Sequence, residues 1–126
     1  MRSQLRRVAG NTVGIFGLGS IGKGFATRVR GFGPEKIIAY DPYVPQTTAD
    51  LVGVQLVDFE TLLTESDYLT VHSPATVETN HIFDIDAFRK MKPSAIFINC
   101  ARGPIVDEAG LQEALETGQI AAAGID

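Results

Sequence analysis

Three glycines near the N-terminus follow the spacing G-x-G-x-x-G, at residues 17–22 (GLGSIG). In such a loop Gly17 permits a tight turn, Gly19 lets a pyrophosphate approach the backbone, and Gly22 lets the next helix pack close to the preceding strand. The N-terminus of that helix also offers N–H groups and partial positive charge to phosphates. The chain has 13 glycines, so a glycine-rich turn that binds nothing is the alternative. The context disfavours it, because the loop leaves an apolar run and opens an amphipathic one.

Asp41 supports the same chemistry. It follows a second apolar run, nineteen residues after Gly22, where a carboxylate would accept hydrogen bonds from the hydroxyls of an adenosine ribose. A carboxylate there would also repel the 2′-phosphate of NADP, by on the order of 4 kcal/mol for unit charges about 4 Å apart at an effective dielectric of 20. Asp41-Pro42 could alternatively be only a turn opener. Together with the glycine loop, Asp41 predicts a site for NAD rather than NADP.

Further candidates follow two later apolar runs, at residues 72–74 (HSP) and 99–103 (NCARG). His72 is either a titratable group in the site or a ring that merely packs at the end of a strand. Cys100 lacks a visible base or second thiol, which favours a small filler residue over a reactive one. Arg102 has a guanidinium suited to a bidentate grip on a carboxylate or phosphate, and its alternative is a surface salt bridge.

The elements that would position these residues alternate along the chain. Five short apolar runs predict buried strands at residues 12–16, 36–40, 68–71, 95–99 and 120–125. Helical patterns separate them, so the chain predicts right-handed crossovers and a parallel sheet. The expected fold class is α/β: a Rossmann-type, doubly wound parallel sheet in three layers with helices on both faces. The order of the strands stays open.

The expected helices have recognisable ends and apolar faces. The first spans residues 20–31 and places Ile21, Phe25 and Val29 on one face. Asp58, Asp84 and Asp107 are expected to cap three later helices. The residues expected to face inward in those helices are Phe59, Leu62, Leu63, Ile85, Phe88, Met91, Leu111, Ala114 and Leu115. Pro93 should prevent the second of the three from continuing, and Gly118 should end the last.

Length and composition exclude several classes. With 126 residues the chain has room for one domain. A net charge of −4 argues against a broad surface for nucleic acid or anionic membranes. The single cysteine excludes an internal disulfide, and no apolar run approaches the roughly 20 residues of a membrane span. We therefore expect a cytoplasmic protein with no membrane, nucleic-acid or metal partner.

Taken together, these motifs resemble the NAD-binding domain of the D-isomer-specific 2-hydroxyacid dehydrogenases. The resemblance covers essentially the whole chain, and its segments are residues 17–22 (GLGSIG), 40–42 (YDP), 66–67 (SD), 72–74 (HSP), 78–79 (ET), 91–93 (MKP), 99–103 (NCARG) and 105–107 (IVD). The NCARG segment is the most specific of them. The resemblance implies cofactor contacts from Gly17, Gly19, Ser20, Ile21, Gly22, Asp41, Ser73, Cys100, Ala101, Arg102 and Asp126.

Within that set the resemblance implies separate roles. Ser20 and Ile21 would contact the pyrophosphate and Asp41 the ribose, with Asp126 near the nicotinamide carboxamide. Arg102 matches the family's catalytic arginine, which holds the substrate carboxylate and polarises the 2-oxo group. The family's acid–base histidine, and the glutamate that tunes its pKa, would lie beyond Asp126, since neither His72 nor His81 matches that histidine.

The resemblance also implies what surrounds this domain. Residues 1–126 are expected to be an NAD(P)-binding Rossmann domain, a fragment without its substrate-binding domain, which binds NAD but does not turn over. The parent would be an oxidoreductase that moves a hydride between nicotinamide and a small 2-hydroxy or 2-oxo acid, and it would pair as a homodimer. An NAD-sensing corepressor resembling the C-terminal binding proteins is the alternative, suggested by residues 5–7 and 41–43. A nucleotide-binding module without turnover is the third hypothesis.

Overall fold

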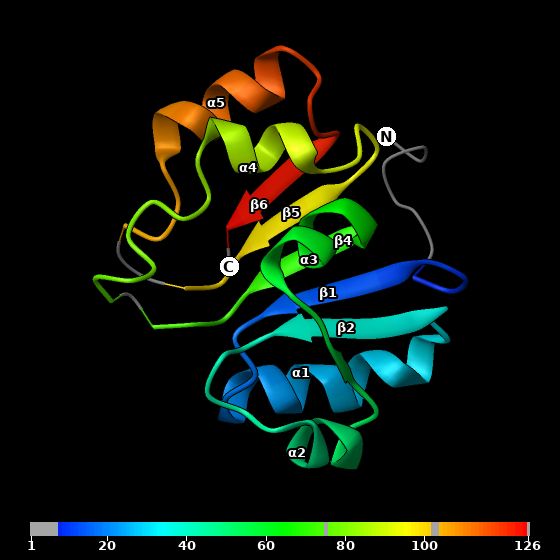
Figure 1. The fold of residues 1–126 in the computed structure, drawn as a ribbon. Helices are drawn as coiled ribbons and strands as arrows, with labels where there is room; N and C mark the ends of the chain where they lie inside the picture. The colour runs from blue at the N-terminus through cyan, green and yellow to red at the C-terminus, as the bar shows by residue number, and fades with distance from the viewer. Residues whose placement is uncertain (1–7, 75, 102–103, 126) are drawn as a thin grey trace.

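The structure is a computed structural model that describes residues 8–74, 76–101 and 104–125. Figure 1 shows a central sheet flanked by helices. The elements, in chain order, are β1 (Thr12–Phe16), α1 (Ser20–Val29), the 3₁₀ turn η2 (Arg30–Phe32), β2 (Lys36–Tyr40), α2 (Gln46–Leu51), β3 (Gln55–Leu56), α3 (Phe59–Glu65), β4 (Tyr68–Val71), α4 (Ile85–Lys90), β5 (Ile96–Asn99), α5 (Glu108–Glu116) and β6 (Ala122–Ile125). The predicted α/β class is confirmed.

The described strands form one six-stranded sheet in the order β3-β2-β1-β4-β5-β6. Every paired strand runs parallel to its neighbour, and β1 lies between β2 and β4. The expected bounds of β1, β2 and β4 are confirmed, whereas β5 begins one residue later and β6 two residues later than expected. The sequence analysis missed α2 and β3. This strand order is that of a doubly wound dinucleotide-binding sheet.

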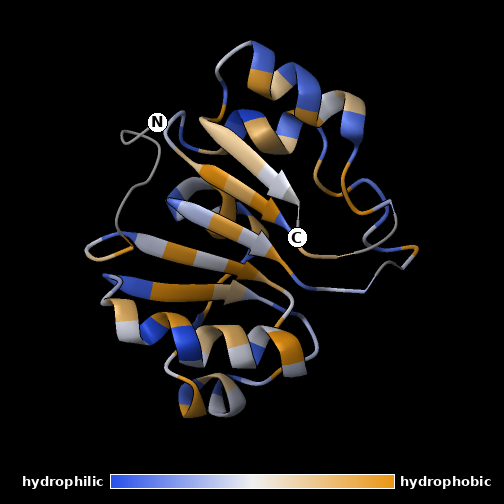
Figure 2. Cartoon of the chain, turned by 180° about the vertical axis from the view of Figure 1, so that it is seen from behind, coloured by the Kyte–Doolittle hydropathy of each residue, from blue (hydrophilic) through white to orange (hydrophobic). Residues whose placement is uncertain are grey.

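Helices cover both faces of the sheet, and alternate residues of each strand face opposite layers. On one face α1 and α2 pack over a cluster that includes Val13, Ile15 and Ile37. On the other face α3, α4 and α5 pack over a larger cluster that includes Phe16 and Ile38. In the hydropathy colouring of Figure 2 the helices are striped with hydrophilic and hydrophobic residues, as helices with one buried side should be.

An aromatic cluster lies within the larger core. Phe83, which is fully buried, has ring centroids of four other phenylalanines around it: Phe16 at 5.0 Å, Phe59 at 5.4 Å, Phe88 at 6.3 Å and Phe97 at 5.0 Å. Its backbone bridges to Val106, so the segment after β4 lies against the segment after β5. The Phe83 ring therefore packs against rings from β1 and β5 and from α3 and α4.

The buried face of α1 differs from the expected one. Gly22, Ala26 and Val29 are buried in α1, whereas Ile21 is 73% exposed. The small side chains of Gly22 and Ala26 let the helix lie close to the sheet. The face of α1 that contacts the sheet is therefore shifted by about one residue from the face that the large apolar side chains predict. The helix also ends at Val29, and η2 follows it, rather than continuing to residue 31.

The predicted caps of α3 and α4 are confirmed. Asp58 accepts from the Thr61 N–H at 2.7 Å, and Asp84 accepts from the Ala87 N–H at 2.9 Å. Hydrogen bonds from the side chain and backbone of Thr61 hold the pKa of Asp58 below its ordinary value. Asp107 occupies the N-cap position of α5 without a side-chain hydrogen bond to the helix, so its expected cap is wrong in that respect.

The inward face of α5 is narrower than expected. Ala114 is buried, but Leu115 is 39% exposed, because only one side of this helix packs against α4 and the larger core cluster. Within the described ranges, no helix combines the length and the apolar character needed to cross a membrane.

The amino edge of the sheet is tied together by Asp67. One carboxylate oxygen accepts from the Thr12 N–H at 2.8 Å, and the other accepts from the Lys92 ammonium at 3.0 Å. The backbone of Asp67 also bonds to Thr12 and Ile96. One residue thus fixes the starts of β1, β4 and β5 relative to one another.

Candidate functional site

The predicted site residues meet at the carboxyl edge of the sheet. Hydrogen bonds continue the ladder one residue past the strand ends, from Gly17 N–H to Tyr40 O at 3.0 Å, His72 N–H to Phe16 O at 2.8 Å and Cys100 N–H to Val71 O at 3.0 Å. The loops after β1, β4 and β5 therefore start from fixed positions along one edge. Ligands of open parallel sheets bind at this edge.

The glycine loop has the geometry expected of a phosphate loop. Gly17 has a φ of 96°, and a Cβ there would come within 2.8 Å of the Ser73 backbone. A Cβ at Gly22 would overlap the carbonyl oxygen of Gly17. At Gly19, in contrast, a Cβ would meet no atom within 4 Å. The first and third glycines thus make a tight turn between strand and helix, and the second leaves the backbone open to a ligand.

The N-terminus of α1 adds positive potential to this loop. Its N-cap is Gly19, which has no side chain to bond the first-turn N–H groups, and its first turn has no acidic residue. By comparison, α3, α4 and α5 each have an acidic residue in the first turn. A ten-residue helix with an uncapped, uncompensated N-terminus can bind an anionic group.

Asp41 lies beside the loop at the end of β2. Its carboxylate is half-buried and accepts from the Leu18 N–H at 2.8 Å and from the Tyr43 N–H at 2.9 Å. A carboxylate has about four acceptor positions, so two remain for the hydroxyls of a ribose. Asp41 thereby both fixes the glycine loop and offers acceptors at the carboxyl edge.

A cleft of about 360 Å³ lies at this edge. Such a volume is within the roughly 300–1,000 Å³ of small-molecule sites. Its lining residues are Phe16, Gly17, Tyr40, Asp41, Pro42, Tyr43, Val44, Ser73, Pro74, Thr76, Glu78, Thr79 and Ile82. The walls are mostly apolar, and the two carboxylates, of Asp41 and Glu78, make the cleft suited to an uncharged ring and a hydroxylated sugar.

The structure brings part of the predicted set to this cleft. Gly17, Asp41 and Ser73 line it, while Ser20 and Ile21 are exposed in the first turn of α1. Cys100 and Ala101 are half-buried just after β5, further along the same edge. The predicted residues Arg102 and Asp126 lie outside the described residues.

Thr70 connects the loops after β4 and β5. Its buried hydroxyl is 2.9 Å from His72 Nε2 and 3.6 Å from Cys100 Sγ. The His72 ring also lies against Phe25 of α1, with ring centroids 5.3 Å apart. Of the two interpretations of His72, the structure favours a packed and hydrogen-bonded ring.

The sequence analysis missed much of the cleft wall. Tyr43 and Glu78, from loops 35 residues apart, hydrogen-bond to each other at 2.6 Å, with the Tyr43 hydroxyl donating. Thr76 and Thr79 brace the loop that holds Glu78 through reciprocal backbone-to-hydroxyl bonds. Residues 78–79 are among the segments that carry the family resemblance, and that resemblance was the one sequence signal that pointed to this part of the cleft wall.

The strand order, the glycine loop and the acidic residue after β2 together define a Rossmann-type dinucleotide-binding domain. The family model described as "D-isomer specific 2-hydroxyacid dehydrogenase, NAD binding domain" matches residues 1–126. The chain therefore belongs to this family, and NAD is the cofactor of its domain type. The open backbone at Gly19 and the acceptors of Asp41 fit that cofactor.

Similar proteins agree with this assignment. D-3-phosphoglycerate dehydrogenase from Mycobacterium leprae is 44% identical over 119 residues, which cover 94% of this chain and 22% of that protein. The apo-structure of D-lactate dehydrogenase from Escherichia coli matches with a TM-score of 0.90 and 36% identity, covering 96% of this chain and 38% of that one.

A second similar structure contains the cofactor. It is the NAD-complexed form of a D-isomer specific 2-hydroxyacid dehydrogenase from Lactobacillus delbrueckii ssp. bulgaricus, with a TM-score of 0.83 and 39% identity, covering 92% of this chain and 34% of that one. The chain spans about a fifth of the length of the phosphoglycerate dehydrogenase, at 22%.

The described ranges hold no group of three or more His, Cys, Asp or Glu side chains that could bind a metal ion together.

Proposed function

We propose that this chain is the cofactor-binding part of an NAD-dependent D-2-hydroxyacid dehydrogenase, which interconverts a small 2-hydroxy acid and its 2-oxo acid. The observation that supports this most is the convergence of the α1 N-terminus, the open backbone at Gly19 and the Asp41 carboxylate at one edge of the sheet. The names of the similar proteins, among them phosphoglycerate and lactate dehydrogenases, indicate the substrate class.

The proposed contacts follow the position of each residue along that edge. The backbone of Gly17, Gly19 and Gly22 and the first turn of α1, with Ser20 and Ile21, would hold the pyrophosphate. The cleft beside Asp41 would hold the adenosine. Ser73, Cys100, Ala101, Arg102 and Asp126 would lie toward the nicotinamide, an assignment that rests on the family resemblance.

When bound, the nicotinamide of NAD supplies the hydride acceptor or donor for the reaction. The chain's own contribution is to bind and orient the cofactor and, through Arg102, to hold the substrate carboxylate. Because neither His72 nor His81 matches the family's acid–base histidine, we propose that the 126 residues alone bind NADH without reducing a 2-oxo acid. A cytoplasmic location is part of the same proposal, supported by the acidic composition and the single cysteine.

Cofactor choice gives the direct test. We expect saturating NAD to raise the melting temperature of the chain, and NADP to raise it far less, because the Asp41 carboxylate would repel a 2′-phosphate. A ligand present at a hundred times its Kd stabilises the folded state by about 2.7 kcal/mol, which a thermal-shift measurement resolves. Asp41→Asn should narrow the difference between the two cofactors.

Asp86→Asn is the matched control, because Asp86 is an exposed residue of α4 with its side chain 78% accessible. It should leave the preference for NAD unchanged. Equal shifts with NAD and NADP in the unmodified chain would contradict the role of Asp41. A shift with neither cofactor would contradict the proposed binding function.

We further propose that the chain pairs with a second copy of itself, as the family resemblance implies. Exposed apolar side chains outside the proposed cofactor site, including Phe32 and Leu51, are available for such contacts. Light scattering at high protein concentration should give a mass of at least twice that of one chain. A mass equal to one chain at all concentrations would contradict the pairing.

A further inference from the structure

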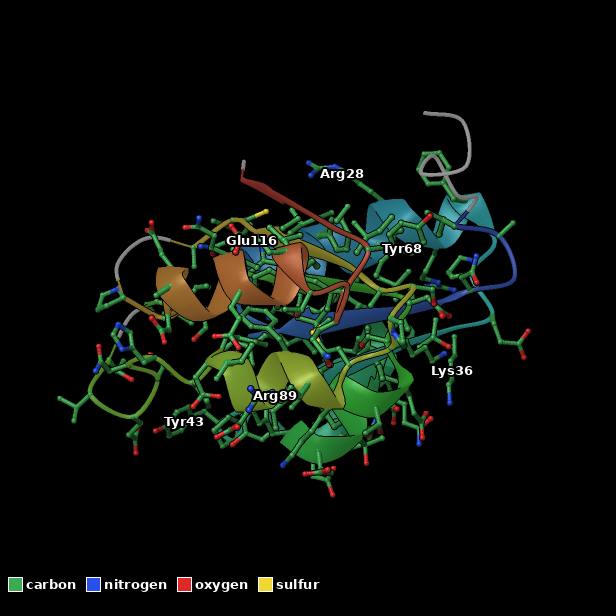
Figure 3. The ribbon with its side chains drawn as sticks, turned by 90° about the horizontal axis from the view of Figure 1, so that it is seen from above. Arg28, Lys36, Tyr43, Tyr68, Arg89 and Glu116 are labelled. Atoms are coloured by element: carbon green, nitrogen blue, oxygen red, sulfur yellow. The ribbon has the colours of Figure 1, made fainter. Side chains whose placement is uncertain are left out.

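The contact between Tyr43 and Glu78 spans the cleft. Tyr43 belongs to the loop after β2 and Glu78 to the loop after β4, and both line the cleft. Because β1 lies between β2 and β4 in the sheet, a contact between these loops passes across the end of β1, where Gly17 begins the glycine loop. In Figure 3 Tyr43 lies at the opposite end of the molecule from Lys36, the first residue of β2.

Both sides of this contact are held in place. The Tyr43 N–H donates to Asp41 Oδ1 at 2.9 Å, and the same carboxylate fixes the glycine loop through the Leu18 N–H. On the other side, Thr76 and Thr79 close a tight turn around Glu78, with Thr76 N–H to Thr79 Oγ1 at 2.8 Å. The contact therefore links the glycine loop, through Asp41 and Tyr43, to the loop after β4.

The charges favour a persistent contact. The Tyr43 hydroxyl donates to Glu78 Oε1 at 2.6 Å, a short hydrogen bond to an ionised acceptor. That hydrogen bond, together with the negative charge of Glu78, raises the pKa of Tyr43 above its ordinary value. The Tyr43 hydroxyl is the donor of this hydrogen bond, and the Tyr43 side chain is otherwise largely exposed.

We propose that Tyr43 and Glu78 form a strap across the adenosine cleft, which slows release of the dinucleotide once it is bound. The inference rests on the proposed function, because it assumes that the adenosine half of NAD occupies this cleft. The two residues are positioning residues: the Tyr43 ring forms an outer apolar wall, and the hydrogen bond to Glu78 keeps that wall over the cleft.

The strap can be tested without any measurement of turnover. NADH Kd by fluorescence titration, NADH release by stopped flow and ADP-ribose Kd by calorimetry are measured for the chain, Tyr43→Phe, Glu78→Ala and the double variant. Tyr43→Phe keeps the ring and loses only the hydroxyl. We expect each single variant to release NADH about two- to tenfold faster and to bind NADH and ADP-ribose correspondingly more weakly, as for one lost hydrogen bond.

The double variant separates a strap from two independent contacts. If both substitutions remove the same hydrogen bond, their effects should not add. The double variant should then bind NADH no more weakly than whichever single variant binds it less tightly. Glu78→Gln should recover part of the loss, because an amide oxygen can still accept from the Tyr43 hydroxyl. Glu116→Ala, an exposed residue of α5 labelled in Figure 3, is the control and should bind as the unmodified chain does.

Each outcome decides between the two proposals. Release rates and Kd values unchanged in both single variants, with normal binding by the unmodified chain, would overturn the strap and leave the proposed function intact. Fully additive losses in the double variant would also overturn it. Failure of the unmodified chain to bind NADH would overturn the proposed function, and the strap with it.

Discussion

Replacement of Arg102 by alanine in the proposed dehydrogenase is expected to lower kcat/KM by roughly thirty- to several-thousand-fold, the equivalent of about 2 to 5 kcal/mol. Arg102 lies outside the described residues, so this prediction rests on its match to the family's catalytic arginine and on its position three residues after β5. The substitution would remove a bidentate contact to the substrate carboxylate and a charge that polarises the 2-oxo group. Arg102→Lys should recover little, because an ammonium lacks the planar fork.

Steady-state kinetics and NADH titration, performed on the same proteins, check this prediction. The Kd for NADH should change much less than turnover, since Arg102 would act mainly on the substrate. Arg89→Ala is the matched control, because Arg89 is an exposed residue of α4, and it should retain normal kinetics. Normal turnover in Arg102→Ala would remove this arginine from the mechanism.

Phe83→Ala is expected to cause the largest loss of stability among single substitutions in the aromatic cluster. The Phe83 ring is fully buried among four other phenylalanines. Truncation of a buried phenylalanine to alanine typically costs about 3 to 5 kcal/mol, through lost burial and the cavity that remains. That is a large share of the roughly 5 to 15 kcal/mol by which domains are stable.

Urea unfolding, followed by circular dichroism, measures this loss. Phe32→Ala is the matched control: it removes the same ring from a position that is 67% exposed, so the free energy of unfolding should change by less than about 0.5 kcal/mol. Phe83→Leu should fall between the two, because it keeps much of the apolar volume. An equal effect of the substitutions at 83 and 32 would contradict the central role of Phe83.

The sequence predicts the strands well because each is a compact apolar run ended by a glycine or a polar residue. The bounds of β1, β2 and β4 follow directly from this pattern. The pattern says nothing about β3, since a strand of two residues is too short for any periodicity and depends on β2 for its hydrogen bonds. The buried face of α1 was misjudged for a related reason: Gly22 and Ala26 make the close contact, and small residues add little to an apolar periodicity.

The residues of the candidate site also divide into those that the sequence could place and those that it could not. Residues within two positions of a strand end, such as Gly17, Asp41 and Ser73, could be placed at one edge from the alternation of strands and helices alone. Tyr43 and Glu78 could not, because their contact depends on how two separate loops turn after leaving β2 and β4. The cap of α5 shows the limit of local rules as well, since Asp107 occupies the N-cap position without making the side-chain bond.

The central position of β1 also determines when the sheet can be completed during synthesis. β1 can pair with β2 as soon as residue 40 is available, but its second neighbour, β4, ends only at Val71. Until then one side of β1 has unpaired backbone groups next to the apolar residues Val13 and Ile15. Such an edge is a template for pairing with another chain. We therefore expect β1 to remain an open edge in the nascent chain until β4 emerges, because β4 is the strand that covers it.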